Sequence, residues 1–239
     1  MRSYDFLAGE VLLVDKPLHW TSFDVVNKLR WKLKKKYGIK RFKVGHAGTL
    51  DPLATGLLII CTGKKTKISQ ELTAEHKTYT GKILLGKTTP SYDLETPFNQ
   101  VVETDHLVQE LELIKNTAKE FVGVQQQTPP IFSAKKVNGK RAYESARKGK
   151  AIELKANEIR IEQFDIDTSN FPEIGFSVKC SKGTYIRSLA HDFGDKLGVG
   201  GTLIELRRTA SGNLSIEDAK SVDDWLNIIE EVEYNSEAL

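Results

Sequence analysis

The sequence predicts an α+β fold, a mixed sheet with helices packed against it. Short apolar runs typical of strands alternate with amphipathic helical segments, and neither a regular βαβ repeat nor any internal repeat accompanies them. The chain has 239 residues, of which 39% are hydrophobic and 28% charged, enough for a substantial core in a globular protein. We therefore expect a mixed sheet rather than a barrel.

The first third of the chain predicts a strand, a helix and a second strand. Residues 10–17 predict a short buried strand, with the apolar run at 11–14 and a proline at its end. A helix should begin near Thr21, which has Asp24 three residues later in a capping-box arrangement, and end at Gly38. Its apolar positions at helical spacing are Val26, Leu29, Leu33 and Tyr37. Residues 57–61 are apolar throughout and predict a buried strand.

The later elements follow from the same patterns. Strands are expected at residues 76–85, from about 154, at 174–180 and at 202–208. Helices are expected at 104–121, from about 143, at 185–197 and in the acidic stretch 215–235. Residues 87–103 are turn-rich and predict a mobile loop. The helix at 185–197 carries Arg187 in its first turn, where a cation opposes the helix dipole, so we expect an acidic partner nearby.

Residues 45–56 are the most unusual stretch. They contain three glycines, one proline and two threonines, a composition that should interrupt regular helix and strand. The apolar run at 57–61 follows at once. Asp51 is therefore predicted to lie in a shaped loop against an apolar wall. An isolated Asp-Pro pair is more often an ordinary turn, so this stretch alone leaves that alternative open.

The charge of the chain is unevenly distributed. The net charge is +3, but residues 216–239 carry −7, which leaves +10 on the first 215 residues. Between residues 28 and 43 there are nine cations and no acid: Lys28, Arg30, Lys32, Lys34, Lys35, Lys36, Lys40, Arg41 and Lys43. This basic run favours a phosphate-binding surface over a merely solvated helix face, because it leads directly into the loop of Asp51.

Several classes of protein and site are disfavoured. No apolar run is long enough to predict a signal peptide or a membrane span, and the two isolated cysteines are typical of a reducing compartment, so we expect a cytoplasmic protein. A P-loop is rejected at residues 56–66, since six residues separate its glycines and a lysine replaces the Ser or Thr. No metal site is expected, because the histidines are scattered: His19, His46, His76, His106 and His191.

Six blocks of the sequence, in order, resemble the bacterial TruB family of tRNA pseudouridine synthases, which act on the T-loop uridine at tRNA position 55. The blocks are Asp15-Lys16-Pro17 with Thr21-Ser22, Gly45 to Gly56, Lys77-Thr78-Tyr79, Pro129-Pro130 with Ser133-Ala134 and Lys136, Gly183 to Arg187, and Leu206-Arg207-Arg208. The resemblance covers residues 10–220. It implies a largely antiparallel sheet flanked by helices, catalysis without metal or organic cofactor, and the T-stem-loop of tRNA as partner.

The resemblance also implies the roles of individual residues. Asp51 resembles the catalytic aspartate, Tyr79 the aromatic residue that packs against the target base, and Arg187 the arginine that pairs with the aspartate. Tyr185 and Leu206 resemble residues that line the uracil pocket. His46 resembles the histidine that enters the space left when the nucleotide flips out. On this interpretation the basic run supplies the RNA-binding surface: Lys28, Arg30, Lys34, Lys35, Lys36, Lys40, Arg41 and Lys43.

The sequence departs from the family pattern in two places. His19 stands where the family often has glycine, which leaves the shape of that turn open. Residues 1–235 are expected to form a single catalytic domain ending in the acidic segment, without the separate C-terminal RNA-binding domain of many relatives. We expect a monomer with no obligate protein partner. Two alternatives stay open: an RNA-binding or tRNA-folding module without catalysis, and a pseudouridine synthase acting on a different RNA hairpin.

Overall fold

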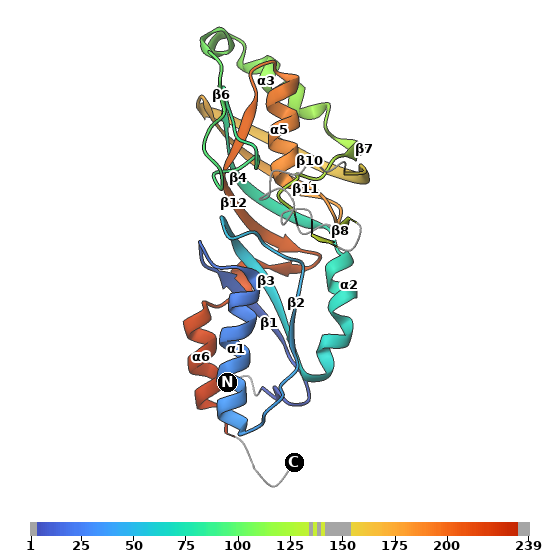
Figure 1. The fold of residues 1–239 in the computed structure, drawn as a ribbon, viewed down its shortest axis with the longest axis vertical. Coiled ribbons are helices and arrows are strands. Elements are labelled where there is room, and N and C mark those ends of the chain that lie inside the picture. Colours follow the sequence, from blue (N-terminus) through green and yellow to red (C-terminus); the bar gives the residue numbers. More distant parts are fainter. Residues whose placement is uncertain (1–3, 134–135, 138–139, 142–153, 234–239) are drawn as a thin grey trace. The chain divides into compact units, whose positions relative to one another are not determined.

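The computed structural model of the chain describes residues 4–133, 136–137, 140–141 and 154–233, which belong to two compact units (Figure 1). Unit 1 comprises residues 1–77 and 207–239, and unit 2 comprises residues 78–206. Strand β12 (Gly201–Ser211) contributes residues to both. Both units combine strands with helices, and every ladder with a described register is antiparallel. These features confirm the predicted α+β fold and its largely antiparallel sheet.

The sheet of unit 1 is built around β3 (Ala54–Thr62). β1 (Val11–Lys16) and β2 (Val44–Ala47) both pair with it in antiparallel register, and the later part of β12 lies next to it and carries β13 (Leu214–Ser215). Residues 57–61 of β3 are completely buried. This apolar strand is therefore the core of the unit, as the sequence predicts.

Two helices lie side by side in unit 1, α1 (Ser22–Tyr37) and α6 (Val222–Glu231) (Figure 1). Each begins with a capping box, Thr21 with Asp24 in α1 and Ser221 with Asp224 in α6. α1 ends at Gly38, whose φ of +65° is the left-handed conformation of a helix C-cap. Both the bounds and the caps of α1 are thus confirmed. The short helices η1 (Gly63–Ile68), α2 (Ser69–Ala74) and η3 (Ile216–Asp218) complete the unit.

The stretch 45–56 is more regular than its composition predicts. Residues 44–47 belong to β2 and residues 54–62 to β3, so only residues 48–53 are irregular and connect the two strands as a hairpin. The prediction of a loop over all twelve residues was wrong. Gly45 adopts a strand conformation within the ladder, and only Gly48 and Gly56 have positive φ angles, of +84° and +98°.

The sheet of unit 2 has the strand order β12, β4 (Lys77–Leu85), β11 (Glu173–Cys180), β10 (Asn157–Asn170) and β7 (Gly123–Gln127). Helices α3 (Leu111–Lys119) and α5 (Ile186–Lys196) belong to this unit, and α3 packs against β10 and α5. Phe121, Phe164, Phe176 and Phe193 form edge-to-face ring contacts in its core. Two short ladders, β5 (Lys87–Thr88) with β6 (Gln100–Val101) and β8 (Lys136–Val137) with β9 (Lys140–Arg141), stand apart from the main sheet.

Some predicted elements differ from the structure. The helix expected from residue 104 is divided into η2 (Asp105–Gln109) and α3, because the chain leaves helical geometry at Glu110, where φ is −117° and ψ is 34°. The acidic stretch 215–235 is likewise divided into η3 and α6. The helix expected from about residue 143 lies outside the described residues. No described helix is long and apolar enough to span a membrane.

His19 occupies a conformation that favours glycine. Its φ is +66°, in the left-handed region, and its backbone N–H donates to the carbonyl of Pro52 at 2.8 Å. The histidine therefore adopts a backbone conformation that glycine accepts more readily, at the cost of steric strain at its Cβ.

We expect His19→Gly to stabilise the protein by about 0.5–1 kcal/mol, since relief of the left-handed strain exceeds the added chain entropy of glycine. Urea unfolding of the two proteins measures the difference. His19→Ala, which keeps the Cβ, serves as the control and should bring no such gain. A glycine variant less stable than the parent would contradict the strain argument.

Candidate active site

The backbone around Asp51 is held at alternate residues. The carbonyl of Gly48 accepts from Nη2 of Arg208 at 3.0 Å, and the carbonyl of Leu50 accepts from Oγ of Ser22 at 3.0 Å. The carbonyl of Pro52 accepts from the N–H of His19. Asp51 itself closes a turn, in which its carbonyl accepts from the N–H of Ala54 at 3.0 Å. The connection between β2 and β3 is therefore fixed on both sides of Asp51, which is itself partly buried.

Arg208 is one of the most buried side chains in unit 1. It is 1% exposed, and its Nε donates to the carbonyl of Leu57 at 2.6 Å. A Cβ added at Gly48 would lie 3.4 Å from its Nη1, and one added at Gly56 would lie 2.3 Å from its backbone oxygen. Gly56 is therefore required twice, by its positive φ angle and by the close approach of the Arg208 backbone, whereas at Gly48 the contact is an ordinary one and only the positive φ angle favours glycine.

A buried lysine lies beside this loop. Lys16 is 0% exposed, and its Nζ donates to the carbonyls of Pro17 at 2.9 Å and Trp20 at 2.6 Å. Burial lowers the pKa of Lys16 to about 8, an effect opposed by the negative charges of Asp51 and Asp24 and reinforced by Arg208. The negative charge of Asp51 therefore favours the charged form of Lys16, and the Lys16 ammonium fixes the turn that contains His19.

A second arginine of the Leu206-Arg207-Arg208 motif links two strands. Nη1 and Nη2 of Arg207 lie 3.0 and 2.7 Å from Oδ1 and Oδ2 of Asp15, a bidentate pair. Nη1 also lies 3.5 Å from Oγ1 of Thr55. Arg207 on β12 thereby connects β1 with the first residues of β3, directly after the loop that contains Asp51.

His46 lies on β2 before the hairpin tip. Its side chain is partly buried, and its Nδ1 has no hydrogen-bond partner among the described residues. Burial, and then the positive charge of Arg208, lower the pKa of His46, so the imidazole is neutral at physiological pH. A neutral imidazole with a free ring nitrogen can contact a nucleotide without binding a phosphate as a cation.

In unit 2, Arg187 is held by the loop at residues 89–96. The guanidinium is 5% exposed, and its Nη1 lies 3.6 Å from Oδ2 of Asp93, itself 7% exposed. Its Nη1 and Nη2 donate to the carbonyls of Ser91 at 3.4 Å and Phe132 at 3.0 Å. The acidic partner expected from the helix dipole is therefore present, and it is Asp93. The pairing of Arg187 with Asp51 that the family resemblance implies stays a prediction.

The other predicted site residues of unit 2 lie on its main elements. Tyr79 on β4 and Leu206 on β12 are each 9% exposed, and Tyr185 precedes α5 and is partly buried. The side chain of Gln127 fixes Tyr185 by two hydrogen bonds: Oε1 accepts from the N–H of Tyr185 at 2.7 Å, and Nε2 donates to its carbonyl at 3.1 Å. The backbone that enters α5 is therefore held at the residue that carries one predicted pocket side chain.

The basic run divides into exposed and internally bonded cations. Arg30 donates to the carbonyl of Val44 at 2.7 Å, Lys36 donates to the carbonyl of Glu230 at 2.6 Å, and Lys32 pairs with the carboxylate of Glu230. Six cations of the run are exposed: Lys28, Lys34, Lys35, Lys40, Arg41 and Lys43. Trp31, 58% exposed, lies on α1 with the ammonium of Lys35 5.5 Å from its ring centroid.

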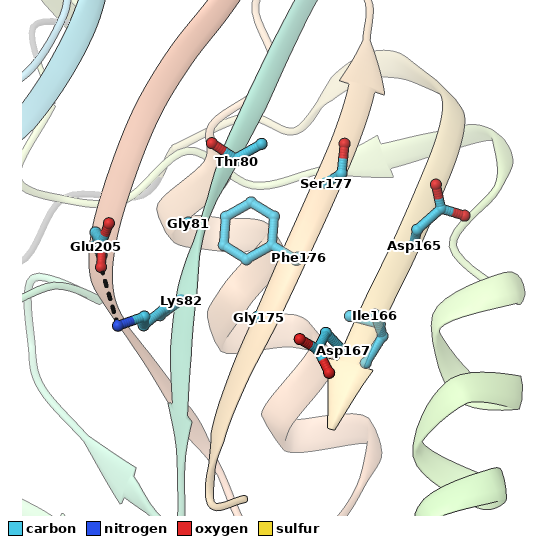
Figure 2. A pocket seen from close by; sticks show the side chains of 10 residues that line it. All are labelled: Thr80, Gly81, Lys82, Asp165, Ile166, Asp167, Gly175, Phe176, Ser177 and Glu205. Carbon is cyan, nitrogen blue, oxygen red and sulfur yellow. Dashed lines mark ion pairs between the residues drawn. The ribbon is translucent and has the colours of Figure 1, made fainter. Parts of the chain in front are cut away.

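A separate pocket of about 420 Å³ lies on the sheet of unit 2 (Figure 2). It contains none of the predicted site residues and is lined by Thr80, Gly81, Lys82, Asp165, Ile166, Asp167, Gly175, Phe176, Ser177 and Glu205. Three of these are acids, and the single lysine lies 3.3 Å from Glu205. Such a lining disfavours a phosphate-rich ligand. Within the described residues, no three His, Cys, Asp or Glu side chains are grouped to hold a metal.

Two models of protein-family domains match the sequence of this chain. The model of the TruB family pseudouridylate synthase N-terminal domain matches residues 34–186, more than half of the chain. This chain belongs to the TruB family. The model of the tRNA pseudouridylate synthase B C-terminal domain matches residues 187–239. These matches confirm the family predicted from the six blocks of the sequence.

Individual TruB relatives are similar over nearly their whole length. The tRNA pseudouridine synthase B of Parabacteroides distasonis is 51% identical over 93% of this chain and 95% of its own. The tRNA pseudouridine synthase B of Flavobacterium johnsoniae is 53% identical over 92% of this chain and 95% of its own.

Two solved structures are also similar. In the crystal structure of a Cbf5-Nop10-Gar1 complex, one chain is 29% identical with a TM-score of 0.65, covering 93% of this chain and 54% of that one. In the structure of an H/ACA RNP bound to a substrate RNA containing 2′-deoxyuridine, one chain is 28% identical with a TM-score of 0.63. The match covers 93% of this chain and 53% of that one. This chain thus spans about half the length of those two chains.

Several residues that build this TruB site were not predicted as site residues. Lys16, Ser22 and Arg208 belong to blocks of the family resemblance, but no sequence pattern assigns them to the loop of Asp51. Asp93 and Gln127 lie far in sequence from the residues they hold. Their roles depend on contacts between distant segments, which only the folded chain defines.

The lowered pKa of Lys16 predicts an unusual pH dependence of stability. Between pH 8 and 10.5 the unfolded chain binds the Lys16 proton more tightly than the folded chain, so the free energy of unfolding rises with pH. Relative to Lys16→Met, which lacks this titration, the wild type should gain up to about 3 kcal/mol over that range. Urea unfolding of both proteins from pH 7 to 10.5 measures it. A constant difference between them would show that Lys16 has an ordinary pKa.

Proposed function

We propose that this protein is a tRNA pseudouridine synthase that converts the T-loop uridine at tRNA position 55 to pseudouridine. The observation that carries the proposal is Asp51, a carboxylate on a hairpin whose backbone is held at residues 48, 50 and 52. Its support comes from membership of the TruB family and from relatives about 50% identical that are named tRNA pseudouridine synthase B.

The reaction requires a group of this kind. The N1–C1′ glycosidic bond of uridine breaks, the uracil turns, and C5 bonds to C1′, so atoms and electrons balance without a redox partner or group donor. The Asp51 carboxylate would act either as nucleophile at C1′ or as the base that removes the neighbouring proton. Both roles require an ionised carboxylate with a fixed direction, and the tethered hairpin supports the second requirement.

We propose that the target nucleotide is flipped out of the folded RNA loop, because a base within the stack leaves C1′ inaccessible to a protein carboxylate. Tyr79 would then pack against the base, and Arg187 would pair with Asp51. Tyr185 and Leu206 would line the uracil site. The neutral imidazole of His46 would occupy the space that the nucleotide leaves.

We further propose that the exposed part of the basic run binds the phosphates of the tRNA. Its support is charge and exposure: the six exposed cations lie on α1 and on the segment between α1 and β2. Arg30 and Lys36, which were predicted to belong to this surface, donate to backbone carbonyls of unit 1. We assign them a structural contribution as well as a positive charge.

The wider proposal is a monomer in the cytoplasm without an obligate protein partner, acting from a single catalytic domain over residues 1–235. Among the similar solved structures, Cbf5 is found with Nop10 and Gar1. Light scattering of the purified protein with and without tRNA tests the monomer: we expect the mass of one chain, free or bound to tRNA, and the mass of a dimer would contradict it.

Asp51→Asn is expected to abolish turnover, by more than about 10³-fold, while tRNA binding stays largely intact, because the change removes the charge with little change in shape. Conversion of uridine in a T-arm transcript, together with a binding curve, measures both quantities. A tRNA-folding module without catalysis would convert no uridine even with Asp51 intact, and a near-normal rate in Asp51→Asn would show that Asp51 is not the catalytic group. Either result would overturn the proposed function.

The triple variant Lys28→Gln, Lys34→Gln and Lys35→Gln is expected to bind tRNA more weakly, by about 10–100-fold near 0.1 M salt. The slope of log affinity against log salt should fall by up to about 2, at roughly 0.7 per lost phosphate contact. These three lysines are exposed, so the fold and the rate at saturating tRNA should be preserved.

The matched control replaces three exposed cations elsewhere in unit 1, Lys64, Lys65 and Lys67, by glutamine and so removes the same charge. An equal loss of affinity in both triple variants would mean that tRNA responds only to net charge. Unchanged affinity and an unchanged salt slope in the α1 variant would show that the basic run is only a solvated helix face. The tRNA would then have to bind another surface of the protein.

A further inference from the structure

Ser22 forms two hydrogen bonds with one residue of the Asp51 hairpin. Its Oγ accepts from the N–H of Leu50 at 2.8 Å and donates to the carbonyl of Leu50 at 3.0 Å. Ser22 is 2% exposed and Leu50 is 3% exposed. Water therefore has no access to replace either bond, and one hydroxyl satisfies both peptide groups of the residue before Asp51.

Helix α1 does not need this hydroxyl for its own N-terminus. The helix is capped by Thr21, whose Oγ1 accepts from the N–H of Asp24 at 3.0 Å. The Asp24 carboxylate in turn accepts from the N–H of Thr21 at 2.8 Å, which completes the capping box. Ser22 is the first residue inside the helix, and its side-chain bonds are directed to Leu50.

The Ser22 bonds act together with the neighbouring turn. The N–H of His19 holds the carbonyl of Pro52, so the segment 19–22 fixes the residue on each side of Asp51. Lys16 fixes this segment in turn through the carbonyls of Pro17 and Trp20. Loss of the Ser22 hydroxyl would leave the buried N–H and carbonyl of Leu50 without partners, and the hairpin would have to shift to satisfy them.

We propose that Ser22 is a positioning residue for Asp51, whose hydroxyl fixes the peptide before the aspartate and so directs its carboxylate. The inference rests on the proposed function in giving Asp51 the catalytic role. Reaction rates depend steeply on such placement, and a displacement of about 1 Å can slow a reaction about 100-fold. Ser22 itself does not contact the reacting atoms.

The adjacent residues Ser22 and Thr21 offer a matched comparison. Ser22→Ala and Thr21→Ala each remove one hydroxyl from the same helix end, but only Ser22 is bonded to the hairpin. For each variant we would measure the single-turnover rate constant at saturating tRNA, the dissociation constant for tRNA, and the melting temperature.

We expect Ser22→Ala to lower the single-turnover rate constant by about 10–100-fold with little change in tRNA affinity. Thr21→Ala should lower the melting temperature at least as much, because it removes a helix cap, yet leave the rate constant within about threefold of wild type. Ser22→Cys fills the same space with a weaker hydrogen-bonding group and should give an intermediate rate. If Ser22→Ala does not fold, Ser22→Cys compared with Thr21→Ala provides the test.

Two results would overturn the inference. A wild-type rate constant in Ser22→Ala would show that Asp51 is positioned without the hydroxyl, and equal slowing in Ser22→Ala and Thr21→Ala would assign the effect to the helix end. Asp51→Asn, measured in parallel, separates this failure from that of the proposed function. If Asp51→Asn is inactive and Ser22→Ala is fully active, only the positioning role of Ser22 is wrong. If Asp51→Asn is active, the catalytic role of Asp51, on which the inference rests, is wrong.

Discussion

The structure of unit 1 depends on holding a short, glycine-containing hairpin tip in one conformation. Three carbonyls in five residues are bound by groups from two distant parts of the chain, His19 and Ser22 on one side and Arg208 on the other. None of these donors belongs to the hairpin. The packing of α1 against the sheet and the position of β12 beside β3 therefore decide where Asp51 lies, and the surrounding fold supplies the rigidity that the loop lacks.

Holding the Asp51 loop in this way costs free energy, and the role proposed for Asp51 gives a reason for that cost. Lys16 and Arg208 are buried cations, and His19 is strained in the left-handed region. Burial of such charges is unfavourable unless they are paired and hydrogen-bonded, and here backbone carbonyls and the Asp51 charge provide the compensation. A carboxylate that reacts at a sugar carbon gains from surroundings that are already fixed, because little rearrangement then accompanies the reaction.

The sequence predicted what local rules control. The capping box of Thr21 and Asp24, the stop at Gly38 and the buried strand at 57–61 are confirmed, and the helix dipole correctly required an acid near Arg187. A strand was expected from about Leu154, but the full length of β10 was not predicted, because a register shift between Ile161 and Gln163 breaks its alternation of apolar and polar residues. The bonds of Ser22, Gln127 and Arg208 join residues 28 to 160 positions apart, and no local pattern encodes them.

This protein is proposed to make pseudouridine in the T-loop of tRNA. Mapping pseudouridine in total tRNA from cells with and without the protein tests it most directly. We expect pseudouridine at position 55 in the cells that contain the protein and unmodified uridine in the cells that lack it. A plasmid copy should restore the modification only if Asp51 is intact. Undiminished pseudouridine at position 55 in cells lacking the protein, with loss at another RNA site, would contradict it.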